Sequence, residues 1–393
     1  MGLRVRTAAA LSTHPLATHA VGECVGQLLE EGGPSPDLLV LGVTDPNLGA
    51  LEDIVGAIRR LLDPAVLIGA RAESVLGGAK EAEHIGAVSM FALWSEAGGN
   101  GLSVTDRSAV VRTVRLASSS GPDGSRRIGV DDLRGAAGTL IVLADPFSVP
   151  VEHMIDRLRS VAPDLVVVGG LVSSARHAGG NRLVADGSIH SDGVVAALVS
   201  PEIGVRTVVS QGCRPIGVPM TVTRCERNVI LELAGRPALE RLMQVVDSLG
   251  PPDRLLAANG LHVGRVVDEH RSEFGRGDFL IRNVLGADRE IGSVAVGDEV
   301  ELGATVQFQV RDARSADEDL AMMMAGHDVV GALVFTCNGR GTRLFGVPDH
   351  DAAVVSEALG GAPVAGLFCA GEIGPVGGTS FVHGLTASVV LFS

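Results

Sequence analysis

The chain has 393 residues, 46% of them hydrophobic and 20% charged, so it is long enough for two well-packed domains and too apolar to be disordered. Its net charge of −14 argues against binding to nucleic acid or to an anionic membrane surface, and the lack of tyrosine argues against a stacking platform for bases. Five scattered cysteines indicate reduced thiols, and no signal peptide or membrane-spanning apolar run occurs, which together predict a cytoplasmic protein.

The N-terminal half contains two similar segments, at about residues 37–95 and 138–200. In each, an apolar run (residues 38–43 or 140–144) is followed by a polar turn, a helix with one apolar face, and a second apolar run that ends at glycine. Strands this apolar are buried on both faces of a sheet. The pattern predicts an α/β fold, with mixed β-sheets flanked by helices and an internally duplicated N-terminal module built from β-α-β repeats.

The C-terminal half is richer in strand patterns, and we place the boundary between the two modules near residue 226. The predicted domains are therefore residues 1–225 and 226–393. In the second domain the apolar runs predict strands at residues 279–284, 305–310, 329–335, 364–368 and 385–391, with helices at 316–324 and 349–359.

Ionisable residues gather on glycine-rich turns near the ends of the last predicted strands. Arg340 lies between two glycines, Glu372 lies in a second glycine-flanked turn, and His383 precedes the final apolar run. One interpretation is a zwitterion clamp, in which Arg340 binds a ligand carboxylate with two hydrogen bonds and Glu372 accepts from the ligand ammonium. The alternative is that Arg340 and Glu372 pair with each other or cap loops, without any ligand.

His383 and the cysteines next to glycine allow further chemistry. His383 could hydrogen-bond a ligand, bind heme or be a buried structural imidazole. Cys213, Cys337 and Cys369 could include a nucleophile if a cation or base lies nearby, although small buried packing residues are the simpler interpretation.

Short motifs in a fixed order carry a resemblance to a known family. They are SQGCRPIG at residues 210–217, CNGRG at 337–341, GEIGP at 371–375 and HGLT at 383–386. The chain resembles the FIST proteins, which have an N-terminal and a C-terminal FIST module, from about residue 35 onward. It departs from the family after His383, where Gly384 stands in place of a frequent asparagine.

The resemblance implies a ligand-sensing protein of signal transduction, whose ligand is an amino acid or a related metabolite. Because no F-box, kinase or cyclase domain is expected in this chain, the resemblance also implies a separate signalling partner. Some relatives bind heme and sense nitric oxide, which is the first alternative; a thiol- or carboxylate-dependent enzyme is the second. We expect no resident cofactor, metal, nucleic acid or membrane contact, and a homo-oligomer that covers edge strands is plausible.

The predicted ligand site is a cleft between the two modules, in which Arg340 and Glu372 face Gln211 and Gly212. The full set of predicted ligand-binding residues is Arg340, Glu372, His383, Gln211, Gly212, Cys337, Gly371 and Thr386.

Overall fold

The structure is a computed structural model that describes residues 3–44, 50–96, 109–120, 126–271, 273–275 and 277–393. The polar turn predicted after the apolar run of residues 38–43, at residues 44–47, lies mostly outside the described residues. The chain divides into two compact units. The first comprises Met1–Val209, Leu320–Pro375 and Thr379–Ser393, and the second comprises Ser210–Asp319 with Val376–Gly378. The boundary predicted at residue 226 therefore falls inside the second unit.

The described part of the first unit contains three repeats of one strand order, each built around a six-stranded sheet. The first repeat runs β1 (Arg4–Ser12), α1 (Ala17–Gly32), β2 (Leu38–Thr44), α2 (Leu51–Leu61), β3 (Val66–Ala72), a hairpin of β4 (Ser74–Gly77) and β5 (Lys80–Glu83), and β6 (Val88–Glu96). β2 and β3 are parallel, and β6 is antiparallel to both β2 and β1. This arrangement confirms the first predicted β-α-β unit.

The second repeat has the same order and confirms the predicted duplication. Its elements are β7 (Val111–Leu116), the small pair β8 (Ser118–Ser120) and β9 (Arg126–Ile128), β10 (Gly138–Ala144), α3 (Val151–Val161), β11 (Leu165–Leu171), a hairpin of β12 (Leu183–Ala185) and β13 (Ser188–His190), and β14 (Val194–Val199). Again the two central strands, β10 and β11, are parallel, and β14 pairs antiparallel with β10 and β7.

The third repeat was not predicted, because a long insertion interrupts it. It begins with β15 (Val205–Gln211) and resumes after residue 319 with the end of α6 (Ala313–Met324), then β24 (Gly331–Cys337), α7 (Thr342–Phe345), α8 (His350–Ala358), β25 (Val364–Cys369), a hairpin of β26 (Gly371–Val376) and β27 (Thr379–His383), and β28 (Thr386–Phe392). β24 and β25 are parallel, and β28 is antiparallel to β24. The second unit is thus inserted between the first two strands of this repeat.

Each repeat contributes its hairpin to the sheet of another repeat. The hairpin β4–β5 of the first repeat pairs with β25 of the third. The hairpin β12–β13 of the second repeat pairs with β3 of the first, and β26 of the third pairs with β11 of the second. The exchange is cyclic, so every sheet depends on residues from two repeats.

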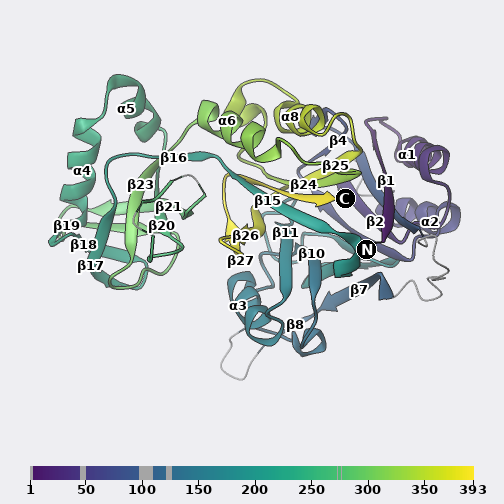
Figure 1. Cartoon of the computed structure of the whole chain (residues 1–393), viewed down its shortest axis with the longest axis horizontal. Coiled ribbons are helices and arrows are strands. Elements are labelled where there is room, and N and C mark those ends of the chain that lie inside the picture. The colour runs from purple at the N-terminus through teal and green to yellow at the C-terminus, as the bar shows by residue number, and fades with distance from the viewer. Residues whose placement is uncertain (1–2, 45–49, 97–108, 121–125, 272, 276) are drawn as a thin grey trace. The chain divides into compact units, whose positions relative to one another are not determined.

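The sheets of the first unit share one central core because both faces of their middle strands are apolar. Alternate residues point to opposite faces: Leu38 and Val40 lie in the shared core, whereas Leu39 and Leu41 pack with α1 and α2. In the third repeat Leu333 and Phe335 enter the shared core, while Ala332 and Val334 pack on the side of α6 and α8. Figure 1 shows α6 and α8 beside β24 and β25, and α1 and α2 beside β1 and β2.

The second unit has its own core around a sheet of eight strands in its described residues. The elements are β16 (Cys213–Pro215), β17 (Met220–Glu226), β18 (Val229–Leu233), β19 (Arg236–Pro237), α4 (Ala238–Ser248), α5 (Pro251–Ala258), β20 (Leu261–Val266), β21 (Phe279–Asp288), β22 (Ser293–Val296) and β23 (Thr305–Arg311). Pairing of β20 with β23 closes the sheet on itself. The predicted α/β class with mixed sheets and flanking helices is confirmed.

Throughout the described ranges, every helix is too short or too polar to cross a membrane.

Candidate functional site

A buried polar cluster lies at the carboxyl ends of the parallel strands β24 and β25. Cys337 is the last residue of β24, and a tight turn follows in which the Arg340 N–H donates to the Cys337 carbonyl over 2.8 Å. Gly341 has φ 60°, and a Cβ there would lie 2.8 Å from a Glu83 carboxylate oxygen. Only glycine suits this position without strain, so the CNGRG turn is shaped to direct Arg340 inward.

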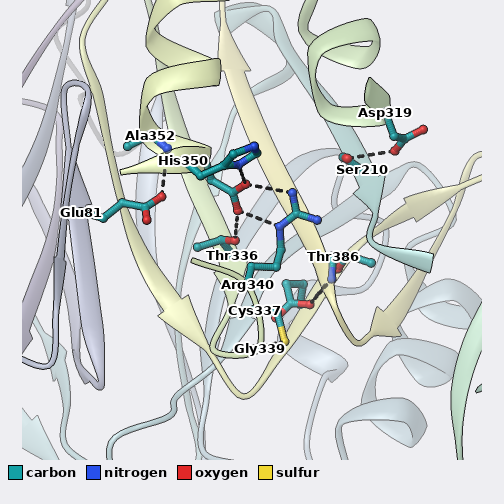
Figure 2. Close-up of polar contacts among 12 residues, drawn as sticks. Glu81, Ser210, Asp319, Thr336, Cys337, Gly339, Arg340, His350, Ala352 and Thr386 are labelled. Carbon is teal, nitrogen blue, oxygen red and sulfur yellow. Dashed lines mark hydrogen bonds and ion pairs between the residues drawn. The ribbon is translucent and has the colours of Figure 1, made fainter. Parts of the chain in front are cut away.

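The partner of Arg340 is Asp351, in the first turn of α8. Arg340 Nε donates to Asp351 Oδ2 over 2.7 Å and Nη2 donates to Oδ1 over 2.9 Å, and neither side chain is exposed. Thr336 Oγ1 donates a further hydrogen bond to Asp351 Oδ2, and His350 Nδ1 lies 3.0 Å from Oδ1 (Figure 2). Burial alone would raise the pKa of Asp351, but the Arg340 charge and these hydrogen bonds hold it well below its usual range.

An aromatic cover lies against this ion pair. The Arg340 guanidinium carbon is 5.2 Å from the centre of the Phe345 ring, a cation–π distance. Phe345 in turn stacks on His350, with ring centroids 3.3 Å apart and planes 9° apart. The short helix α7, which carries Phe345, is bounded by Gly341 and Gly346, both with positive φ.

Glu372, at the start of β26, is the second buried acid of the cluster. One carboxylate oxygen, Oε2, accepts from Thr386 N–H over 3.1 Å and from Thr386 Oγ1 over 2.7 Å. Burial raises the pKa of Glu372 to about 8; the Thr386 hydrogen bonds, the Arg340 charge and the neighbouring Cys337 thiol oppose that rise only in part. Glu372 therefore holds its proton at neutral pH.

Two thiols stand next to each other beside Glu372. Cys337 and Cys369 are register partners on the parallel strands β24 and β25. Burial, followed by the negative charge of Glu372, raises the pKa of Cys337 to about 12 and that of Cys369 well above its usual value. Both thiols are therefore protonated and poorly nucleophilic, which does not support the thiol-dependent enzyme of the second alternative.

The first repeat supplies acidic residues that hold the turns around Arg340. Glu81 accepts the Ala352 N–H in the first turn of α8 over 3.0 Å, and Glu83 accepts both the N–H and the hydroxyl of Thr342 at the start of α7. Burial and the charge of Asp351 raise the pKa of Glu81 to about 7. Sequence reasoning missed Glu81 and Glu83, since nothing local indicates that a hairpin contacts a turn 250 or more residues away. It also missed Asp351, which lies 11 residues after Arg340.

The family models divide the chain in two. The FIST N domain matches residues 37–236, and the FIST C domain matches residues 238–375. The chain belongs to the FIST family. It is 40% identical to the uncharacterized protein Mb0898c of Mycobacterium bovis (strain ATCC BAA-935 / AF2122/97), over 99% of both chains. It is 41% identical to the uncharacterized protein Rv0628c of Mycobacterium tuberculosis (strain ATCC 25618 / H37Rv), over 99% of this chain and 100% of the relative. FIST domains are sensory rather than catalytic and are implicated in signal transduction.

Several of the predicted residues lie in the cluster, most of them within the FIST C match of residues 238–375 and Thr386 beyond it. Cys337, Arg340, Glu372 and Thr386 are in the cluster, and Gly371 starts the strand that carries Glu372. A Cβ at Gly371 would lie 3.0 Å from Leu171 Cδ1, so this glycine allows close packing of β26 on β11.

His383 is buried, at 3% exposure, at the end of β27. Its Nε2 makes a 2.9 Å hydrogen bond with the Gly374 carbonyl, which makes Nε2 the protonated nitrogen. Its ring also meets the Phe381 ring edge-on, at 6.4 Å. A heme iron binds an imidazole nitrogen without a proton, so Nε2 is not available to it in this arrangement, and heme binding stays a prediction. Among the described residues, no group of three His, Cys, Asp or Glu side chains is arranged to hold a metal ion.

Gln211 and Gly212 belong to the second unit and have contacts there. Gln211 Nε2 donates to the Phe279 carbonyl over 2.7 Å, and the Gln211 N–H donates to Asp319 Oδ2 over 2.8 Å. Ser210 Oγ donates to the same Asp319 oxygen (Figure 2), and the Gly212 carbonyl accepts from the Asp312 N–H. That these residues face Arg340 and Glu372 across a cleft stays a prediction.

Proposed function

We propose that the chain is a cytoplasmic sensor that binds a small metabolite, an amino acid or a related molecule, at the Arg340–Glu372 cluster. It would pass the signal to a separate protein partner. The observation that carries the proposal is a buried polar cluster whose hydrogen bonding is incomplete. Among the described residues, Arg340 Nη1 and Glu372 Oε1 are both buried without a hydrogen-bond partner. Buried polar atoms are nearly always paired in native proteins. Other buried atoms of the described residues also have no partner, but Glu81 Oε2 and Asn338 Oδ1 lie on residues around the same turn, so the group together suggests a binding position.

The place of the cluster in the fold supports the same function. Ligands of α/β proteins commonly bind outside the carboxyl ends of parallel strands, and Cys337 and Cys369 end two such strands. The turn after β24 and the hairpin β4–β5 surround this end with side chains from two different repeats. Membership of a sensory family agrees with binding of a ligand by such a cluster.

A ligand can reach Arg340 only if part of its cover moves, because Arg340 and Glu372 have no exposed surface. The helix α7 is the best candidate for this movement. It is four residues long, lies between the glycines Gly341 and Gly346, and carries Phe345, which contacts both Arg340 and His350. Short segments hinged at small residues are typical of lids that close over bound ligands.

The proposal is tested by thermal-shift screening of amino acids, their amides and related metabolites, followed by calorimetry of the compounds that raise Tm. We expect at least one compound to bind the purified protein and to lose most of its affinity in Arg340→Lys, which keeps the charge but not the planar fork. Glu357→Gln, an exposed change on α8, is the matched control and keeps full affinity. Equal binding by Arg340→Lys would place the ligand elsewhere, and the absence of any binding would refute a sensory site in this cluster.

A further inference from the structure

Arg340 Nη1 and Glu372 Oε1 are two of the buried atoms without a hydrogen-bond partner among the described residues, and the hydrogens that they carry restrict the ligand group that can bind them. Asp351 accepts one N–H from Nε and one from Nη2 of Arg340, along one edge of the guanidinium (Figure 2), whereas Nη1 is buried without a hydrogen-bond partner among the described residues. A guanidinium donates hydrogen bonds and accepts none. Because Asp351 already takes the edge formed by Nε and Nη2, a ligand would meet Arg340 at Nη1 and not at the edge that Asp351 holds.

Glu372 also presents a donor. Its Oε2 accepts both Thr386 hydrogen bonds, while its Oε1 is buried without a hydrogen-bond partner among the described residues; the Cys337 thiol lies close enough to the carboxyl group to lower its pKa. An ionised carboxylate with one unsolvated oxygen is costly in a buried site, whereas a carboxylic acid with its proton on Oε1 is not. The rise of the Glu372 pKa to about 8 agrees with this placement. The Arg340 charge and the Cys337 thiol lower the pKa of Glu372, and the charge of an ionised Glu372 raises the pKa of Cys369.

The charge balance of the cluster decides what kind of acceptor it takes. Arg340 and Asp351 neutralise each other, and Glu372, Cys337 and Cys369 are uncharged at neutral pH. A carboxylate or an ammonium would add an unbalanced charge to a site without exposed surface, and such burial is strongly unfavourable. An uncharged oxygen satisfies both donors without that cost.

We propose that the ligand group bound between Arg340 and Glu372 is an uncharged acceptor oxygen, the carbonyl oxygen of an amide or a similar group. It receives one hydrogen bond from Arg340 Nη1 and one from the carboxylic acid of Glu372. This inference rests on the proposed function, and it reverses the role of Glu372, which donates to the ligand instead of accepting from an ammonium.

The test compares three small compounds by calorimetry at constant ionic strength: N-methylacetamide, acetate and methylammonium. We expect N-methylacetamide to bind the wild-type protein at least about tenfold more tightly than the other two. Only the protonated form of Glu372 donates. The affinity of the protein for N-methylacetamide should therefore fall about tenfold at one pH unit above the Glu372 pKa of about 8.

Glu372→Gln is the decisive variant because its amide keeps a donor and cannot ionise. We expect it to bind N-methylacetamide with near wild-type affinity at neutral pH and to lose the pH dependence, while Glu357→Gln behaves as wild type. Preferred binding of methylammonium that disappears in Glu372→Gln would overturn the inference. Preferred binding of acetate would also overturn it. Either result would leave the sensor proposal intact. If none of the three binds, the inference fails, and the broader metabolite screen decides the sensor proposal separately.

An infrared measurement tests the proton without any ligand. A protonated buried carboxyl gives a separate C=O band at neutral pH, and we expect this band in the wild-type protein and its loss in Glu372→Gln. If the region of this C=O band is the same in wild type and in Glu372→Gln, then Glu372 is ionised in the wild-type protein, which would overturn its role as a donor.

Discussion

Arg340 and Asp351 form a two-point ion pair in which neither side chain exposes any surface to solvent. Replacing Asp351 with Asn leaves the Arg340 charge buried without its counterion. We expect this change to lower the free energy of unfolding by about 3–5 kcal/mol, measured by urea denaturation. The double replacement of Arg340→Met and Asp351→Leu removes both charges and should recover most of the loss. A loss below about 1 kcal/mol for Asp351→Asn would contradict the importance of the pair.

Glu372 makes the stability of the protein fall as the pH rises. Its pKa is about 8 in the folded chain, against 4.5 as its ordinary value, so the folded state binds more protons over this window. Stability from this group is complete below about pH 4.5 and decreases by up to about 1.4 kcal/mol per pH unit until about pH 8. Glu81, with a pKa of about 7, adds to the slope in the same direction. Unfolding curves of Glu372→Gln should be flatter across this range; curves parallel to those of wild type would disprove it.

Glu83 fixes the start of α7, so its removal should loosen the cover of Arg340 locally. Glu83→Ala removes the acceptor of the Thr342 N–H and hydroxyl and costs about 1 kcal/mol, as loss of a helix cap does. Hydrogen exchange at residues 342–346 should accelerate. Lys80→Ala is the matched control on the same strand, since the Lys80 side chain is largely exposed and its ion pair with Asp349 contributes little, and exchange should not change. Unchanged exchange in Glu83→Ala would show that the contact does not hold α7.

The thiols differ in their expected reactivity. Cys337 and Cys369 are 7% and 2% exposed and burial raises the pKa of both, whereas Cys225 on β17 is only half-buried. With iodoacetamide at about neutral pH we expect Cys225 to react first in the native protein, and Cys337 and Cys369 only on unfolding. Mass spectrometry of peptides identifies the modified sites, and Cys225→Ser should lack the fast phase. Rapid modification of Cys337 would instead support the alternative of a thiol-dependent enzyme.

The repeats illustrate what sequence patterns predict and what they miss. β2–α2–β3 and β10–α3–β11 were predictable because their strands are apolar on both faces and their helices have one apolar face. The third copy escaped because residues 210–319 separate its first strand from its second. A signal was present nonetheless: a two-residue turn of Gly78-Ala79, Asp186-Gly187 or Gly377-Gly378 joins each exchanged hairpin, as tight turns with positive φ require.

The cluster was predictable only in its local part. Arg340, Glu372 and Cys337 stood out because glycines frame the turns next to them. Asp351 did not stand out, because a single acidic residue in the first turn of a helix is ordinarily explained by its favourable interaction with the helix dipole. The contact of Glu81 with α8 depends on the edge pairing of β4 with β25, and no local pattern encodes which edge a hairpin will join.

The cyclic exchange of hairpins has a consequence for synthesis of the chain on the ribosome. The second repeat can assemble most of its sheet early, but its edge at β11 waits for β26, which follows 200 residues later. The hairpin β4–β5, made early, has to wait until β25 emerges nearly three hundred residues later. A nascent chain that lacks the final residues therefore exposes open strand edges in two repeats, a state prone to non-native pairing. Neither edge can close before β25 and β26 have been made.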